Sequence, residues 1–211
     1  MSLELSFFPV CYPPHFNIKR ALRVSSSEIG DCPLDITFEN DFDAPKHRGR
    51  LHHAIDVFGV IGLHIVATIS GTVVQHYHYS EGRAAGPGAS KSEGGGYYVR
   101  LIDDYGYVHY YSHLHLPPMV ESGDRVPAGQ VIGLLGQTGL AASSCPHLHY
   151  QVRRPLRLSR KRSYSTDLGG NYYSTRGREA VNPYSELVRL CIAAGGQSSG
   201  GTNYKISMPL P

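Results

Sequence analysis

The stretch "CPHLHYQV", residues 145–152, places two histidines one residue apart in a run that otherwise has the pattern of a β-strand. Side chains alternate between the two faces of a strand, which rises about 3.3 Å per residue. His147 and His149 are therefore predicted to lie on one face, roughly 7 Å apart. At that separation the two side chains can take two different chemical roles at the same small site.

Short runs of the same kind fill the chain from about residue 52 to this stretch. They are rich in β-branched and aromatic residues, and Gly, Pro, Asp and Asn separate them, which predicts an antiparallel β domain. In "YYVRLIDDYGYVHYYSHL", residues 97–114, two aromatic-rich runs flank "DDYG", as expected of a hairpin. One helix is expected late in the chain, where Asn182 can cap it and Pro183 suits its first position.

Composition divides the chain into three parts. Residues 1–47 are rich in Pro, Ser and Asp and are interpreted as an N-terminal extension that packs on the core. Residues 48–194 form the main domain, with a polar, basic insertion loop at about 157–180. Residues 195–211 are low in apolar content until their end and are expected to form a C-terminal tail.

Charge and hydropathy exclude several classes of protein. Charged residues make up 18% of the chain and the net charge is +3, which argues against a nucleic-acid-binding arm or a disordered acidic segment. No apolar run approaches the roughly 18 residues of a membrane span. The N-terminal apolar run is interrupted by Pro9 and has no basic region, so no signal peptide is recognisable and the export route stays open.

The four cysteines do not fix a redox state. They have no C-x-x-C spacing, so a zinc ribbon or a thioredoxin-like motif is not indicated. Their even number allows two disulfides in any of three connectivities, or free buried thiols.

Histidines are the chemically informative residues. Isolated ones such as His109 are interpreted as surface or satisfied core residues. Candidate ligands occur at three places: His52 with Asp56, His113 with His115, and His147 with His149. Two histidines and a carboxylate that leave one position open form the usual catalytic zinc arrangement. On a straight strand His52 and Asp56 would lie about 13 Å apart, so both reach one ion only if the backbone bends between them.

Several stretches between residues 51 and 188 together resemble a known family. "HHAIDVFGVIGLHIVATISGTVV" is similar to a motif H-x-G-x-D followed by a turn and by G-x-V. "YYSHL", "VESGDRVPAGQVIGLLGQTG" and "PHLHYQV" follow in the family's order, and "VNPYSEL" resembles its closing segment. The family is that of the lysostaphin-type zinc peptidases, the glycyl-glycine endopeptidases.

The resemblance assigns roles to five residues of this sequence. It implies that His52, Asp56 and His149 bind one Zn²⁺ per chain, and that His113 and His147 are the catalytic pair beside the metal. Which of the pair is the general base stays open. His53, next to His52, is an alternative ligand.

The resemblance also implies a fold. We expect a mainly β, antiparallel, duplicated-hairpin (lysostaphin-like) fold with an open groove and a short C-terminal helix. The segments 80–96 and 157–180 lie where the family places groove walls, and they are expected to be either substrate contacts or solvated loops. Ala54 stands where the family has glycine, so the bend is strained if it needs a positive φ.

The implied function is zinc-dependent endopeptidase hydrolysis of peptide cross-links in bacterial peptidoglycan. Such a cell-wall hydrolase acts in the periplasm or outside the cell. With no recognisable signal peptide, we expect delivery as an antibacterial lytic effector, which would have an inhibitor or immunity protein as a partner. The partner implied in every case is the peptidoglycan peptide, with no nucleic acid.

Two other classes of function, an activator and a carrier domain, are weighed against this one. A non-catalytic activator of the same fold is expected to lack one or more of the five site positions, all of which are present. A histidine phosphocarrier has no use for Asp56 as a ligand, and a lipoyl carrier needs an exposed hairpin lysine that is absent between Lys91 and Lys161.

Overall fold

The structure is a computed structural model that describes residues 3–14, 16, 32–46, 49–77, 94–155 and 179–207. The expected groove-wall segments 80–96 and 157–180 lie largely outside these residues. Strands dominate the described part of the chain, and its one α-helix, α2 (Tyr184–Ala193), follows near the C-terminus. The expectation of a mainly antiparallel β fold with a short C-terminal helix is confirmed.

Most strands belong to one large sheet, in which all neighbours are antiparallel. Its spatial order is β10 (Arg125–Val126), β7 (Gly71–Tyr77), β8 (Tyr97–Asp103), β9 (Val108–Leu114), β12 (His147–Arg153), β5 (Ile55–Phe58), β2 (Ile36–Phe38), β15 (Asn203–Ile206) and β14 (Gln197–Gly200). The short β13 (Ala180–Val181) pairs with β12.

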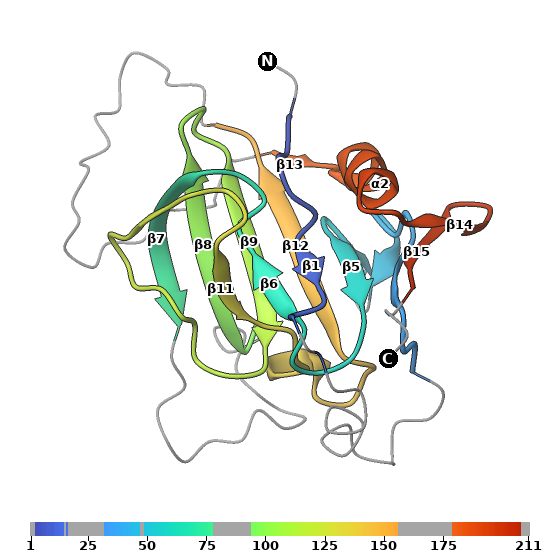
Figure 1. Ribbon diagram of the computed structural model, residues 1–211. Helices are drawn as coiled ribbons and strands as arrows, with labels where there is room; N and C mark the ends of the chain where they lie inside the picture. Colours follow the sequence, from blue (N-terminus) through green and yellow to red (C-terminus); the bar gives the residue numbers. More distant parts are fainter. Residues whose placement is uncertain are drawn as a thin grey trace.

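A second, three-stranded sheet lies in front of the large sheet in Figure 1. It consists of β1 (Val10–Cys11), β6 (His64–Val66) and β11 (Val131–Leu134), with β6 in the centre. Buried residues of both sheets, such as Ile65, Ile132 and Tyr111, form one apolar core between them. The small sheet therefore covers only one face of the large sheet.

Strand β12 shows how the two faces differ. Leu148, Tyr150 and Val152 are at most 1% exposed and face the core. The alternate residues His147 and His149 point to the opposite face, as the strand pattern predicts. The uncovered face of β5, β12, β9 and β8 is the floor of the open groove.

The hairpin predicted around "DDYG" is present, with β8 and β9 as its arms. The Asp103 carboxylate accepts hydrogen bonds from the backbone N–H groups of Tyr105 and Tyr107 at 2.9 and 2.8 Å. Gly106 adopts a φ of +83°, a conformation that favours glycine. The turn residues thus account for the predicted hairpin.

The N-terminal residues contribute two strands. β1 pairs with β6, and β2 lies between β5 and β15 in the large sheet. Phe8, Val10 and Ile36 are buried in the core. These described residues pack on the sheets rather than standing apart from them.

The C-terminal residues differ from the expected tail. Residues 197–206 form the β14–β15 hairpin, which extends the large sheet through pairing with β2. The Tyr204 ring stacks on Phe38, with ring centroids 5.9 Å apart. All four residues of β14 are exposed, so its sequence carries no apolar alternation from which to predict a strand.

Helix α2 begins close to the predicted position. The Tyr184 N–H donates to the Asn182 side chain at 2.9 Å, and the helix buries Leu187, Leu190 and Cys191. Ala194, the residue that ends the helix, is exposed. Among the described residues no helix is long and apolar enough to span a membrane.

The cysteines resolve into one disulfide and two free thiols. Cys32 is bonded to Cys145, 113 residues further along the chain, whereas Cys11 is exposed and Cys191 is buried.

Strands β3 (Pro45–Lys46) and β4 (Arg50–Leu51) form a separate short sheet. Lys46, Arg50 and Leu51 of this sheet line the groove.

Candidate metal centre

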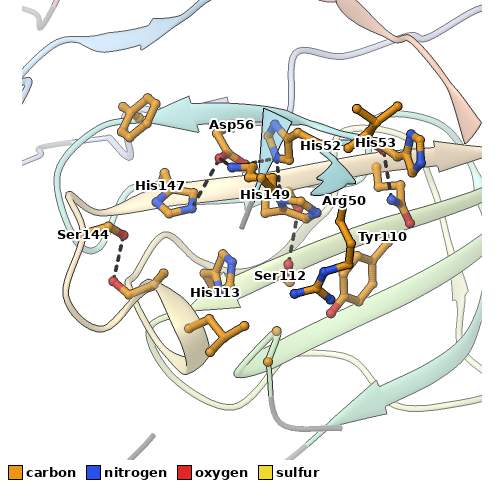
Figure 2. A pocket seen from close by; sticks show the side chains of 18 of the residues that line it. Arg50, His52, His53, Asp56, Tyr110, Ser112, His113, Ser144, His147 and His149 are labelled. Atoms are coloured by element: carbon orange, nitrogen blue, oxygen red, sulfur yellow. Dashed lines mark hydrogen bonds and ion pairs between the residues drawn. The ribbon is translucent and has the colours of Figure 1, made fainter. Parts of the chain in front are cut away.

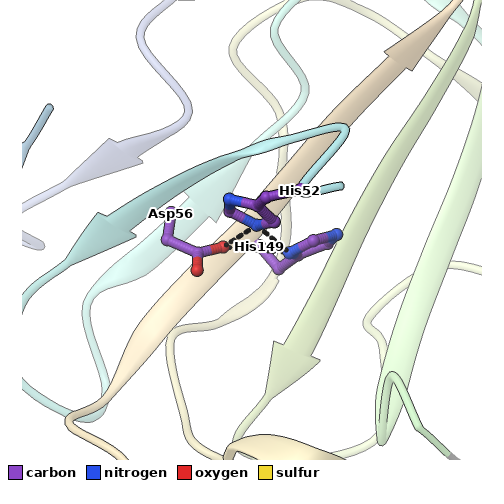
Figure 3. Close-up of side chains that lie close together, drawn as sticks. All are labelled: His52, Asp56 and His149. Carbon is purple, nitrogen blue, oxygen red and sulfur yellow. Dashed lines mark hydrogen bonds and ion pairs between the residues drawn. The ribbon is translucent and has the colours of Figure 1, made fainter. Parts of the chain in front are cut away.

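Three side-chain atoms meet at one point of the groove (Figure 3). His52 Nε2 lies 3.1 Å from His149 Nδ1 and 3.1 Å from Asp56 Oδ1. His149 Nδ1 lies 2.9 Å from the same carboxylate oxygen. These residues form a group whose ligand atoms could all hold one metal ion.

Strand pairing and one bend create this convergence. Asp56 on β5 lies directly opposite His149 on β12. His52 precedes β5, and the chain bends at Ala54 before the strand begins. The bend that the H-x-x-x-D spacing requires is therefore present. Ala54 is buried but does not have a positive φ, so the strain expected there does not arise.

Asp41 supports two of the three residues, through the His52 ring and the Asp56 backbone, and sequence reasoning missed it. His52 Nδ1–H donates to Asp41 Oδ2 at 2.8 Å, and the Asp56 backbone N–H donates to Asp41 Oδ1 at 3.3 Å. Metal-binding histidines typically donate their second ring N–H to a carboxylate in this way. Asp41 lies in "ENDFDAP", where no spacing relative to His52 identifies it.

With neutral rings, the three atoms that converge from His52, Asp56 and His149 include more hydrogen-bond acceptors than donors. Because His52 Nδ1–H is directed at Asp41, the Nε2 atom of a neutral ring carries a lone pair. The Asp56 oxygen is also an acceptor, so while both rings are neutral at most the His149 ring supplies one proton among the three atoms. The donor set, two imidazoles and one carboxylate, is suited to a cation such as Zn²⁺.

Electrostatics favour positive charge at the same point. Burial acts to raise the pKa of Asp56, but hydrogen bonds from His149 and His52 hold it well below its usual range. Burial acts to lower the pKa of His52, but hydrogen bonds to Asp41 and Asp56 raise it to about 9. Without a metal ion this ring therefore takes up a proton on Nε2, which a bound cation would replace. Lys46 adds a long contact, with its Nζ 3.6 Å from Asp56 Oδ2.

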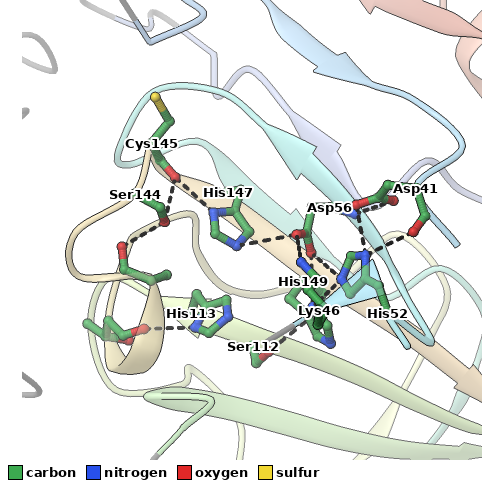
Figure 4. Close-up of polar contacts among 12 residues, drawn as sticks. Asp41, Lys46, His52, Asp56, Ser112, His113, Ser144, Cys145, His147 and His149 are labelled. Carbon is green, nitrogen blue, oxygen red and sulfur yellow. Dashed lines mark hydrogen bonds and ion pairs between the residues drawn. The ribbon is translucent and has the colours of Figure 1, made fainter. Parts of the chain in front are cut away.

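His113 and His147 lie beside this group and share one arrangement (Figure 4). His113 Nδ1–H donates to the Thr138 carbonyl at 2.8 Å, and His147 Nδ1–H donates to the Cys145 carbonyl at 2.8 Å. Each ring therefore keeps a lone pair on Nε2 when it is neutral. Their ring centroids are 5.0 Å apart.

Both rings are held in the neutral form. Burial, followed by the charges of His147 and His149, lowers the pKa of His113 to about 3. Burial also lowers the pKa of His147. The two rings therefore offer open Nε2 atoms that are placed to exchange a proton with a bound reactant.

A backbone irregularity brings His113 to this face. The β8–β9 register moves from Tyr98–Ser112 to Tyr97–Leu114, so His113 is the extra residue of a β-bulge and has a φ of +66°. In a regular strand Ser112 and His113 would face opposite sides. The bulge lets both line the groove, and a positive φ at a non-glycine residue is frequent at functional sites.

The other histidines that were considered lie elsewhere. His53 turns toward Asp43, with its Nδ1 2.9 Å from that carboxylate, and 43% of its side chain is exposed. The structure thus brings His52, not His53, to the three-atom group. His115 follows β9 and is not among the described residues that line the groove.

The groove has two distinct ends (Figure 2). His113, His147 and Ser144 lie toward one end, and Arg50 and Tyr110 toward the other. Leu140 and Leu51 also line the groove and are 62% and 50% exposed. An extended ligand that reached from one end to the other would pass the group formed by His52, Asp56 and His149.

Comparison with known proteins gives consistent matches. The sequence model of peptidase family M23 matches residues 50–165. Lysostaphin from Staphylococcus simulans is 36% identical over 104 residues, which cover 49% of this chain and 18% of that protein. Glycyl-glycine endopeptidase ALE-1 from Staphylococcus capitis is 35% identical over 104 residues, which cover 49% of this chain and 25% of its own length. The match thus spans a quarter or less of either relative.

A solved structure shares the fold. It is described as a glycyl-glycine endopeptidase, LytM, from Ruminococcus gnavus and has a TM-score of 0.51 to this chain at 18% identity. The alignment covers 87% of this chain and 59% of that chain. At this identity the likeness concerns the fold alone.

Proposed function

The chain belongs to peptidase family M23, and from this premise we propose that it is a zinc-dependent endopeptidase that hydrolyses peptide cross-links of bacterial peptidoglycan. The similarity to lysostaphin and to a glycyl-glycine endopeptidase supports the substrate class. The observation that carries the proposal is the convergence of three possible ligand atoms next to two imidazoles with open Nε2 atoms.

The three ligand atoms fit zinc in their chemical type and in their distances from one another. Ligand atoms about 2.0–2.1 Å from a tetrahedral ion lie roughly 3.3 Å from one another. The three atoms of His52, Asp56 and His149 are separated by 2.9 to 3.1 Å, close to that spacing. A bound Zn²⁺ supplies Lewis-acid polarisation of the scissile carbonyl.

The chain's own residues supply the proton transfers. When water attacks the carbonyl carbon, the Nε2 lone pair of His113 or His147 can take a proton from it. The imidazolium formed in this way carries an N–H that can return the proton to the amine as the C–N bond breaks. Before that transfer neither Nε2 has a proton to donate, because each Nδ1–H is committed to a backbone carbonyl.

The test combines metal analysis with substrate digestion. Purified protein is expected to contain one zinc per chain and to release defined fragments from peptidoglycan, identified by mass spectrometry. Treatment with a zinc chelator should stop the release, and added Zn²⁺ should restore it. Fragment release that persists without metal would contradict the proposal, as would the absence of cleavage in peptidoglycans of every cross-link type.

We also propose that the protein acts outside the cytoplasm, in the periplasm or beyond it. The Cys32–Cys145 disulfide supports this because structural disulfides persist in oxidising compartments. Mass spectrometry of protein recovered from cell fractions should find the bond intact only outside the cytoplasm, and an intact bond in the cytoplasmic fraction would count against it. Delivery as a lytic effector, with an immunity protein as partner, stays a prediction.

A further inference from the structure

The position of His113 depends on an irregular backbone. This residue is the extra one of the β8–β9 bulge and has a φ of +66°. A residue other than glycine is strained in this conformation and keeps it only where its surroundings fix it. His147, the other ring of the pair, lies on β12, which pairs with β5 in continuous register. His113 therefore needs more support from its neighbours than His147 does.

The Thr138 hydroxyl bridges the two strands directly beside the bulge. The Tyr97 N–H of β8 donates to Thr138 Oγ1 at 3.1 Å, and the Thr138 hydroxyl donates to the Leu114 carbonyl of β9 at 2.7 Å. Tyr97 and Leu114 lie opposite each other at the register shift. One hydroxyl, acting as acceptor and donor, thus joins the strands at the point where the bulge disrupts their pairing.

The main chain of Thr138 holds the His113 ring as well. His113 Nδ1–H donates to the Thr138 carbonyl at 2.8 Å, and the His113 backbone N–H donates to the Gly95 carbonyl at 2.8 Å. Thr138 therefore contacts both the ring and Leu114, the residue that follows it in the chain. A displacement of Thr138 would move the ring and the bulge together.

A glycine leaves the space that the Thr138 hydroxyl occupies. Gly96 has a φ of +61°, and a Cβ atom at this position would overlap Thr138 Oγ1 and the backbone between Thr138 and Gly139. A larger residue at position 96 would push the hydroxyl away from the strands. The bridge is thus a close-packed contact and not a loose one at the surface.

From these contacts we propose that Thr138 is a positioning residue, whose hydroxyl fixes the bulge so that His113 presents its open Nε2 to the reacting groups. The proposal rests on the proposed endopeptidase function and deepens it. Thr138 is not among the described residues that line the groove, so it acts through His113 and not by touching the substrate. Proton transfer requires hydrogen-bond distance, and a displacement of about 1 Å can cost roughly 100-fold in rate.

Replacement of the hydroxyl by a methyl group tests the proposal. T138V keeps the shape of the side chain, and we expect its kcat to fall about 10- to 100-fold, with KM and zinc content close to those of the wild type. T138S keeps the hydroxyl and should have nearly the wild-type kcat. T72V is the matched control, because it makes the same change on β7, outside the described groove lining. A wild-type kcat in T138V would overturn the proposal.

Combination with H113A separates positioning from a general structural role. If Thr138 acts through His113, its hydroxyl has nothing left to position once that ring is removed. H113A/T138V should therefore turn over at the same rate as H113A, with both rates referred to the folded fraction of the protein. A further fall as large as the one that T138V causes in the wild type would overturn the proposal.

The tautomer of His113 gives a readout that does not depend on turnover. Nitrogen NMR of isotope-labelled protein, with the ring signals assigned by their loss in H113A, should show a proton on Nδ1 in the wild type. T138V should show a mixture of tautomers, and T138S the wild-type pattern. An unchanged His113 spectrum in T138V would overturn the proposal. Because this comparison holds even if no peptidoglycan is cleaved, failure of the positioning role and failure of the proposed function are distinguishable.

Discussion

Two histidine–aspartate clusters lie on opposite faces of the large sheet. In the core, the side chains of His109 and Asp103 are 0% and 1% exposed, and their N–O distance is 3.2 Å. In the groove, those of His149 and Asp56 are 22% and 10% exposed, and the corresponding distance is 2.9 Å. The two clusters have the same residue types and similar N–O distances. They differ in the balance between hydrogen-bond donors and acceptors.

The core cluster is satisfied without any added group. A single chain of donors runs from the Thr68 N–H to Tyr111, back to the Thr68 hydroxyl, then to Tyr150, His109 and Asp103. Each proton in that chain has one acceptor, and the whole chain is buried. Buried polar networks of this kind specify a unique packing.

The groove cluster has too few donors for its acceptors while its rings are neutral, because three possible ligand atoms then meet with at most one proton among them. The comparison indicates that an excess of acceptors, not histidine–aspartate contacts as such, distinguishes the candidate metal centre from the structural network in the core.

The largest expected effect is the loss of metal and activity in D56A. Removal of this carboxylate leaves two imidazoles, so we expect zinc to fall from about one per chain to background, with no detectable peptidoglycan cleavage. The matched variant D103A should keep its zinc and lose stability instead. Metal analysis and thermal melting of both proteins measure this. Full zinc content in D56A would contradict the ligand assignment.

The next effect separates proton transfer from metal binding. H113A and H147A should retain zinc, because neither ring is within the three-atom group, while kcat falls by about 10²–10⁴. H109A, from the core cluster, is the control and should keep kcat in the fraction that stays folded. If H113A and H147A turned over at the wild-type rate, the proton-transfer roles would be wrong.

The disulfide should contribute mainly to stability. Cys32 and Cys145 close a long loop, so the double variant C32S/C145S should lose about 2–5 kcal/mol of unfolding free energy. Because Cys145 also supplies the carbonyl that orients His147, kcat should fall as well, by less than in H147A. Denaturant titration and single-turnover kinetics test this. A reductant should have no effect on the double variant, and an unchanged midpoint relative to the wild type would refute the prediction.

The smallest effect concerns one hydroxyl of the core network. Y150F removes the donor to His109 and the acceptor for Thr68, which should cost about 1–3 kcal/mol. For a chain of this size that loss lowers Tm by roughly 2–4 °C per kcal/mol. Y105F, at an exposed position, should change Tm little. Equal melting of the two variants, with zinc retained, would show that the network is dispensable.

Much of the fold was predictable because its signals are local. Alternation in residues 147–152 and the turn "DDYG" predicted a strand and a hairpin, and both are present. The resemblance to lysostaphin-type peptidases was confirmed by the family match and the related sequences. The β14–β15 hairpin was missed because its outer strand is polar and exposed on both faces.

The site was only partly accessible to sequence reasoning. The shared face of His147 and His149 follows from alternation, but the position of His113 depends on a bulge with positive φ, which strand periodicity cannot indicate. Asp41 and the Cys32–Cys145 bond are long-range partners, and no spacing rule connects them to the residues they support. Such contacts depend on tertiary structure.

The most direct test of the account is an anomalous difference map, recorded at the zinc absorption edge, from crystals grown with one equivalent of Zn²⁺. We predict a single strong peak within bonding distance of His52 Nε2, His149 Nδ1 and an Asp56 carboxylate oxygen. A map with no peak there, or with its main peak at another group of side chains, would contradict the central claim.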